Sequence, residues 1–81
     1  MTAKADGREM LLTELEVGNQ AVVSRIEARD KKTLNKLMAL GVLPGMKVSL
    51  MQKFPSYIFK VGNTRIAADE EITGSIVVIK K

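Results

Sequence analysis

The three consecutive carboxylates Asp69, Glu70 and Glu71 are the residues best suited to hold a metal ion. Carboxylate oxygens bind hard divalent cations such as Mg²⁺, Ca²⁺ and Mn²⁺. Consecutive side chains diverge on any regular element, however, so they rarely converge on one ion. Acids also stabilise the first turn of a helix, so a helix start is the favoured interpretation and metal binding is the alternative.

Catalytic chemistry has little support from the residue types present. The 81-residue chain contains no His and no Cys, which removes the commonest general base and the usual zinc ligands. No Ser or Thr therefore has a His to activate it. The phosphate-binding motifs GxxxxGK[ST] and GxGxxG are also missing from the sequence. We therefore expect a protein that is not an enzyme, with no catalytic residue and no cofactor-binding residue.

Basic residues exceed acidic ones, with 13 Lys and Arg against 9 Asp and Glu and a net charge of +4. Lys53, Lys60 and Arg65 fall in a segment, residues 53–65, that contains no acid. Such a patch attracts nucleic acid, an anionic membrane surface or an acidic partner protein, whereas the simplest alternative is a solvated face. Tyr57 lies between these cations and has a ring that can stack on a base. Only 4% of the residues are aromatic, which favours a place in the core or at a sheet edge.

The methionines are the other candidate for a contact surface, because exposed Met adapts to apolar partners. Met46 and Met51 are the candidates for a surface patch, and covering one end of the fold is the alternative. Met38 is interpreted as a core residue. No apolar run approaches the ~18 residues of a membrane-spanning helix, and the start of the chain does not resemble a signal peptide. We therefore expect a cytoplasmic protein.

The stretch 34–48 carries the strongest structural signals. Asp30 is the predicted N-cap of a helix over residues 31–40, and Gly41 supplies the left-handed residue after it. Pro44-Gly45 has the composition of a type II turn that leads into a strand. The spacing of the helix predicts an inward face formed by Leu34, Leu37, Met38 and Leu40.

Alternating and β-branched residues predict about five short strands around this helix. Residues 1–8 are expected to be a disordered tail and 9–81 a single domain. A helical turn is expected near residues 12–18, capped by Thr13 and ended by Gly18. The predicted strands are 20–27 with a bulge near Ser24-Arg25, 47–54 with Phe54 facing inward, 57–61, 64–67 and 75–79. Gly62-Asn63 is the predicted hairpin turn. Because closing the sheet removes exposed edges, we expect a mainly β, small, partly open SH3-like barrel with one inserted helix.

Residues 37–48, with the sequence LMALGVLPGMKV, closely resemble the signature of the FeoA family. The resemblance extends over most of the chain. Residues 12–18 are similar to the opening of the family, residues 61–68 to its hairpin, and residues 76–78 to its last strand. It implies an SH3-like barrel and a small cytoplasmic protein of bacterial ferrous iron uptake. It also implies action with FeoB, the Fe²⁺ permease that carries a cytoplasmic GTP-binding domain.

This resemblance leads to a hypothesis about the working surface. The domain would dock on cytoplasmic FeoB through an exposed apolar patch, with a basic rim beside it. The candidate partner-binding residues are Leu43, Met46 and Met51 in the patch, and Lys53, Lys60 and Arg65 in the rim. The matched motif residues are structural, so no metal ligand follows from the family.

Two other function classes stay open at the level of sequence. An SH3-like barrel with this charge can be an RNA-binding module, which would show strong and salt-sensitive RNA binding. The carboxylates at 69–71 can instead make the domain a regulator that weakly binds Fe²⁺ or another divalent metal. We expect a monomer that does not insert into the membrane.

Overall fold

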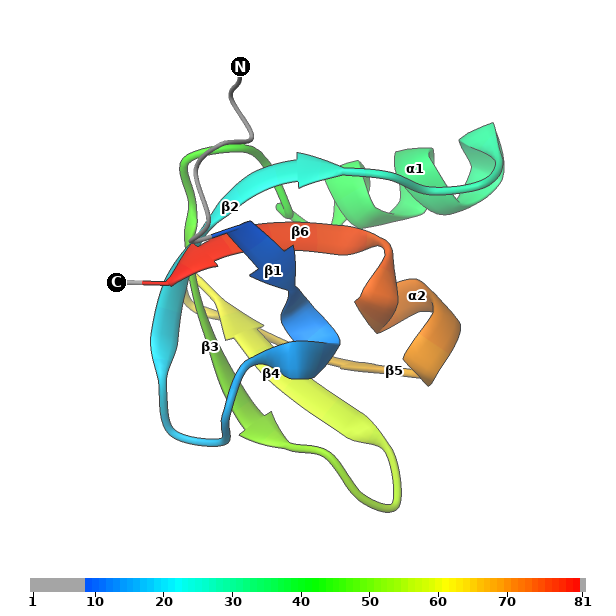
Figure 1. Cartoon of the computed structure of the whole chain (residues 1–81). Coiled ribbons are helices and arrows are strands. Elements are labelled where there is room, and N and C mark those ends of the chain that lie inside the picture. The colour runs from blue at the N-terminus through cyan, green and yellow to red at the C-terminus, as the bar shows by residue number, and fades with distance from the viewer. Residues whose placement is uncertain (1–8, 81) are drawn as a thin grey trace.

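The computed structural model describes residues 9–80, which form one six-stranded antiparallel sheet with the strand order β1-β6-β2-β3-β4-β5 (Figure 1). The sheet curls around the core without closing, so β1 and β5 are its two edges. The predicted SH3-like fold with one main helix is therefore confirmed. The elements are β1 (Glu9–Leu11), η2 (Leu12–Glu14), β2 (Gln20–Ile26), α1 (Lys31–Ala39), β3 (Lys47–Gln52), β4 (Tyr57–Val61), β5 (Thr64–Ala68), α2 (Glu70–Gly74) and β6 (Ile76–Lys80).

The strand missing from the sequence prediction is β1, which pairs with β6 through Glu9–Leu11. Three residues carry too little alternation to signal a strand, and their pairing with a distant segment creates it. The helical turn that follows also differs from expectation. Its N-cap is Leu11, whose N–H donates to the Glu14 carboxylate at 2.9 Å, so Thr13 lies inside the turn and does not cap it. The turn ends at Glu14, well before Gly18.

The predictions around α1 are confirmed at its ends. The Asp30 carboxylate accepts a hydrogen bond of 2.7 Å from the N–H of Thr33, which makes it the N-cap. At the other end Gly41 has φ +96°, and the N–H of Val42 donates to the carbonyl of Leu37 at 3.0 Å. That pair, with a second bond between Gly41 and Met38, is the Schellman motif.

The predicted inward face of α1 is wrong for two of its residues. Leu37 is buried and Leu34 is half-buried, but Met38 is 45% exposed and Leu40 37% exposed. The helix lies beside the sheet rather than across it (Figure 1), so of its residues only Leu37, in the last turn, is part of the core cluster. Met38 is therefore a surface residue.

The predictions for the turn after α1 and for the bulge in β2 are also confirmed. Gly45 has φ +93°, and the N–H of Met46 donates to the carbonyl of Leu43 at 3.1 Å, as a type II turn requires. The register between β2 and β6 shifts between Val23 and Arg25, where the bulge was expected. Val61 pairs with Thr64, which leaves Gly62-Asn63 as the two-residue hairpin turn.

The prediction for Phe54 is wrong: its side chain is 86% exposed. β3 ends at Gln52, and its register with β4 shifts between Leu50 and Gln52. The bulge breaks the alternation, so the inward phase of Val48 and Leu50 does not extend to residue 54. The Phe54–Pro55 peptide bond is cis.

The core lies inside the curled sheet around Phe59, which is fully buried. β6 lies between β1 and β2 in the sheet, and its residues Ile76, Val77 and Val78 are all buried. The prediction of a last strand covered on both faces is therefore confirmed.

The buried hydroxyl of Thr73 has no hydrogen-bond partner in the described part of the chain. Because an unsatisfied buried polar group carries its full desolvation cost, we expect Thr73→Val to stabilise the domain by about 1 kcal/mol. Thermal unfolding would register this as a rise in Tm of roughly 4–8 °C. Thr73→Ser, which keeps the hydroxyl and removes a methyl group, should lower the Tm. A lower Tm for Thr73→Val would instead mean that the hydroxyl has a partner.

Asp30 gives the domain a specific dependence on pH. The hydrogen bond from the N–H of Thr33 lowers the pKa of Asp30. A lowered pKa means that the carboxylate stabilises the fold above the usual aspartate pKa of about 3.9 and loses this contribution as pH falls through the lowered value. Asn also caps helices but carries no charge. The stability difference between the parent and Asp30→Asn should thus be constant near neutral pH and shrink in acid, as measured by urea unfolding. A difference that stays constant down to pH 2 would contradict this assignment.

Candidate functional site

The outward side chains of β3, β4 and β5 form a basic row. Ser49 pairs with Lys60, and Lys60 pairs with Arg65, so the two cations lie directly opposite each other on neighbouring strands. Their inward neighbours Phe59 and Ile66 are buried, which fixes both cations on the outer face. A shallow hollow of about 170 Å³ lies on this face, lined by Gln20, Lys47, Val48, Ser49, Lys60 and Gly62.

The charges of the chain are segregated along the sequence. Residues 31–68 contain no acid but seven cations, Lys31, Lys32, Lys36, Lys47, Lys53, Lys60 and Arg65. Within residues 9–80, neither Lys60 nor Arg65 has an ion-pair partner. Like charges directly opposite each other destabilise a strand pair. The stability of the sheet therefore does not explain this pair.

Arg25 shows the contrasting situation of a cation used by the fold. Its guanidinium donates to Glu9 at 2.7 Å and to Glu27 at 2.7 Å. These hydrogen bonds, above all the one donated to Glu9, raise the pKa of Arg25. Arg25, on β2, thereby links β2 to β1 across the intervening strand β6. It is not part of the basic row.

The three carboxylates at 69–71 are not brought together as metal ligands. Asp69 is the N-cap of α2, and its carboxylate accepts from the N–H of Ile72 at 2.8 Å. Glu70 and Glu71 are exposed in the first turn of α2, as the helix-start interpretation requires. Among residues 9–80 no group of three or more His, Cys, Asp or Glu is arranged to hold a metal ion.

The apolar candidates lie at opposite ends of β3. Leu43 is 40% exposed in the turn before the strand, and Met46 is half-buried against the core. Met51 is 41% exposed near the other end. Met51 is five residues after Met46 along an extended chain, which places the two roughly 16 Å apart. The structure thus divides the predicted patch into two surfaces.

The first surface, here called the turn end, contains Leu43, Met46, Lys60 and Arg65. The N–H of Gly62 in the β4–β5 hairpin donates to the carbonyl of Lys47 at 3.1 Å, which holds the hairpin beside the residue after Met46. The second, the loop end, contains Met51 and Lys53 with the exposed ring of Phe54. Sequence reasoning missed Phe54, although the following Pro55 is a signal that the strand has ended.

Tyr57 is half-buried, packs against the core and pairs with Ala68. The core or edge interpretation of its ring is therefore correct, and the ring is not displayed between Lys53 and Lys60 for stacking on a base. The basic-face hollow has a volume of about 170 Å³, and two others, one beside Arg25 and one between α1 and β5, have about 250 and 40 Å³. They are smaller than the roughly 300–1,000 Å³ pockets that hold small molecules, so the outer surfaces are the better candidates for function. In the described part of the chain, no helix has both the length and the apolar character needed to cross a membrane.

An open, curled antiparallel sheet with one main helix beside it defines a small SH3-like domain. The FeoA domain model matches residues 10–80, and the chain belongs to the FeoA family. No curated protein sequence matches the chain significantly.

Solved structures support the same assignment. An iron uptake regulatory protein, FeoA, is 25% identical with a TM-score of 0.79, and the match covers 90% of this chain and 99% of that one. FeoA of Stenotrophomonas maltophilia, solved with zinc, is 28% identical with a TM-score of 0.77 and coverage of 85% and 88%. That protein is described as a procaryotic SH3 domain protein with a suggested role as a bacterial ferrous iron transport activating factor. IdeR of T. acidophilum shares the fold, with 22% identity, a TM-score of 0.82 and coverage of 90% and 34%.

Proposed function

We propose that this chain is a non-catalytic, cytoplasmic accessory protein of ferrous iron transport that binds the cytoplasmic, GTP-binding region of a FeoB-type permease. Membership of the FeoA family supports the link to iron transport. The absence of His and Cys from the sequence supports a role in binding rather than in catalysis.

The observation that carries the proposal is the Lys60–Arg65 pair on the outer face of the sheet, which has no ion-pair partner among residues 9–80. Leu43, exposed in the turn before β3, is the apolar residue of the same proposed surface. The two cations keep their charges available to a partner, because no acid of residues 9–80 pairs with them. A charged group on a flat face contributes mostly to the rate and specificity of association. An exposed apolar side chain in the same interface contributes because water is released from its surface when the partner covers it. The turn end therefore fits an acidic partner surface that contains an apolar depression.

Binding at the turn end gives a simple route to regulation. The partner would contact β4 and β5 and the turn before β3, all of which are fixed by the sheet, so the domain binds as a rigid body. Nucleotide turnover or iron passage then changes only if one conformation of the permease binds the turn end more tightly than another. The coupling between nucleotide and domain affinity measures this difference directly.

The experiment is an NMR titration of the labelled domain with the cytoplasmic region of the permease, with and without nucleotide and Fe²⁺. We expect amide shifts at Leu43, Lys60 and Arg65, and an affinity that depends on the nucleotide. Shifts confined to Met51 and Lys53 would move the contact to the loop end. A titration in which neither surface shifts would overturn the proposal.

Two further titrations test the alternative classes. Tight, salt-sensitive binding of single-stranded RNA at the basic row would identify a nucleic-acid module. Shifts at Asp69, Glu70 and Glu71 on addition of Fe²⁺ or Mn²⁺ alone would identify a weak metal site. We expect neither, because Tyr57 packs on the core and Asp69 already accepts a hydrogen bond from Ile72.

A further inference from the structure

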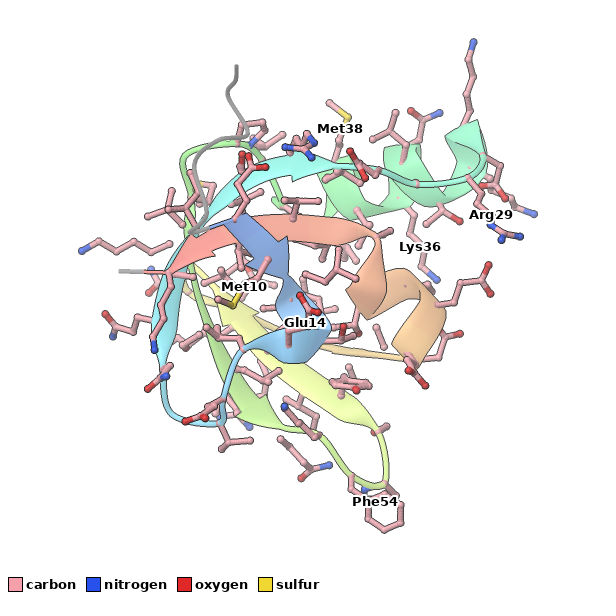
Figure 2. The ribbon with its side chains drawn as sticks, in the orientation of Figure 1. Met10, Glu14, Arg29, Lys36, Met38 and Phe54 are labelled. Atoms are coloured by element: carbon pink, nitrogen blue, oxygen red, sulfur yellow. The ribbon has the colours of Figure 1, made fainter. Side chains whose placement is uncertain are left out.

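Phe54 is a large aromatic side chain that the fold does not use. It is 86% exposed, and Figure 2 shows its ring at the tip of the β3–β4 loop, pointing away from the body of the domain. The loop is braced without it, since the side-chain amide of Gln52 donates to the carbonyl of Ser56 at 3.1 Å. Exposing a phenyl ring to water brings no benefit to folding. A binding role explains its position better than a structural one.

Two more exposed apolar side chains accompany Phe54 at the loop end. Met51 is 41% exposed and Val17, in the segment between η2 and β2, is 54% exposed. The N–H of Gly18 donates to the carbonyl of Leu50 at 2.8 Å, which holds the Val17 segment against the end of β3. The exposed apolar surface therefore comes from two neighbouring segments.

The surroundings of Phe54 favour contact with lipid over insertion into a protein pocket. Aromatic anchors in protein interfaces are normally surrounded by contacts that exclude water. The residues next to Phe54, namely Lys53, Pro55 and Ser56, are all exposed and form no such rim. At the boundary between lipid headgroups and acyl chains, the lipid itself covers apolar and aromatic side chains while Lys meets the headgroups, so a protein rim is not needed.

The charge of the domain selects the kind of lipid. Lys53 adjoins Phe54, and residues 47–65, which include the loop end, contain four cations and no acid. Glu16, beside Val17, opposes this attraction, but the net charge of the chain is +4. Each Lys or Arg close to an anionic leaflet strengthens binding, and the effect weakens with salt.

We propose that the loop end is a membrane-contact site, in which Phe54 enters the headgroup region of an anionic bilayer and Lys53 meets the lipid phosphates. Contact is reversible, because one ring and a few cations give only weak anchoring. The proposal does not depend on any partner protein. It also leaves the turn end free, because Met46 and Met51 lie at opposite ends of β3.

The test uses the full chain with vesicles of phosphatidylcholine alone or mixed with phosphatidylglycerol. The chain has no Trp, so Phe54→Trp places a single indole at the tip. We expect its emission to move to shorter wavelength, and its quenching by iodide to fall, with the anionic vesicles at low salt. Met38→Trp is the matched control, since Met38 is also exposed and lies at the opposite end of the domain (Figure 2), and its emission should not change.

Co-sedimentation measures the binding itself. We expect Phe54→Ser to lower the partition coefficient roughly tenfold, because part of the apolar transfer of the ring is lost. Lys53→Gln should lower it about fivefold, the effect of one cation near an anionic surface. Phe54 and Lys53 are exposed, so both variants should keep the Tm of the parent.

Unchanged emission of Phe54→Trp with anionic vesicles, or equal sedimentation of Phe54→Ser and the parent, would overturn the proposal. An emission shift seen only with the cytoplasmic region of the permease would also overturn it and assign Phe54 to a protein interface. Because the vesicle assays contain no permease, failure here leaves the docking at the turn end intact, and the converse also holds.

Discussion

Replacing Lys60 and Arg65 together with Glu is expected to weaken association with the permease region about a hundredfold, because like charges then face each other across the interface. The two residues are paired across β4 and β5, so the double replacement exchanges one like-charge pair for another. The stability of the sheet should therefore change little, and the loss of binding should not come from unfolding. Isothermal titration calorimetry and the Tm of the variant together measure both effects.

The matched control is Lys31→Glu with Lys32→Glu. It changes the net charge by the same amount but places the acids in the first turn of α1, where they suit the helix dipole. We expect this control to bind nearly as the parent does at physiological salt, where distant charges are screened. Equal weakening by both double replacements would mean that net charge alone attracts the partner and that the basic row is not a site.

Replacing Gly45 with Val is expected to destabilise the domain by about 2 kcal/mol, because a β-branched residue at positive φ is strained. Gly45 has φ +93°. A Cβ added there meets nothing within 4 Å, so the cost comes from the backbone and not from a clash. In a domain of this size the Tm should fall by roughly 10 °C.

Gly45→Asn is the control for this turn, since Asn tolerates the left-handed region far better than a β-branched residue does. We expect Asn to cost clearly less than Val in urea unfolding. If the two variants unfold at the same urea concentration, the type II geometry of the turn does not hold the domain together. The same comparison at Gly41, with φ +96° and open space around it, should give the same order.

The features that the sequence predicted correctly are those that local chemistry decides. Asp30 caps α1 because its carboxylate reaches an N–H three residues away, and Asp69 does the same for α2. Gly41 and Gly45 occupy backbone conformations that side chains avoid. Each signal involves a few consecutive residues, so the rest of the fold cannot cancel it.

Apart from the cap of η2, where Leu11 takes the place predicted for Thr13, the errors concern features that distant segments decide. Met38 has the spacing of a core residue, but α1 lies beside the sheet and leaves it 45% exposed. In the sequence, Phe54 continues the alternation of β3. In the structure, the bulge against β4 and the end of the strand leave its side chain exposed to water. β1 exists only because β6 pairs with it. The prediction of a single apolar patch was wrong for a related reason, because the length of β3 separates Met46 from Met51.

The place of β6 in the sheet also sets the order in which the chain can fold during synthesis. β6 begins at Ile76 and lies between β1 and β2, which the ribosome makes long before it. Until β6 emerges, β1 has no neighbour, and β2 is paired only with β3. A nascent chain that stops before Ile76 therefore lacks the apolar strand that joins β1 to β2. The sheet therefore cannot be completed in order from the N-terminus, whereas β3, β4 and β5 pair through short local connections, which favour early formation.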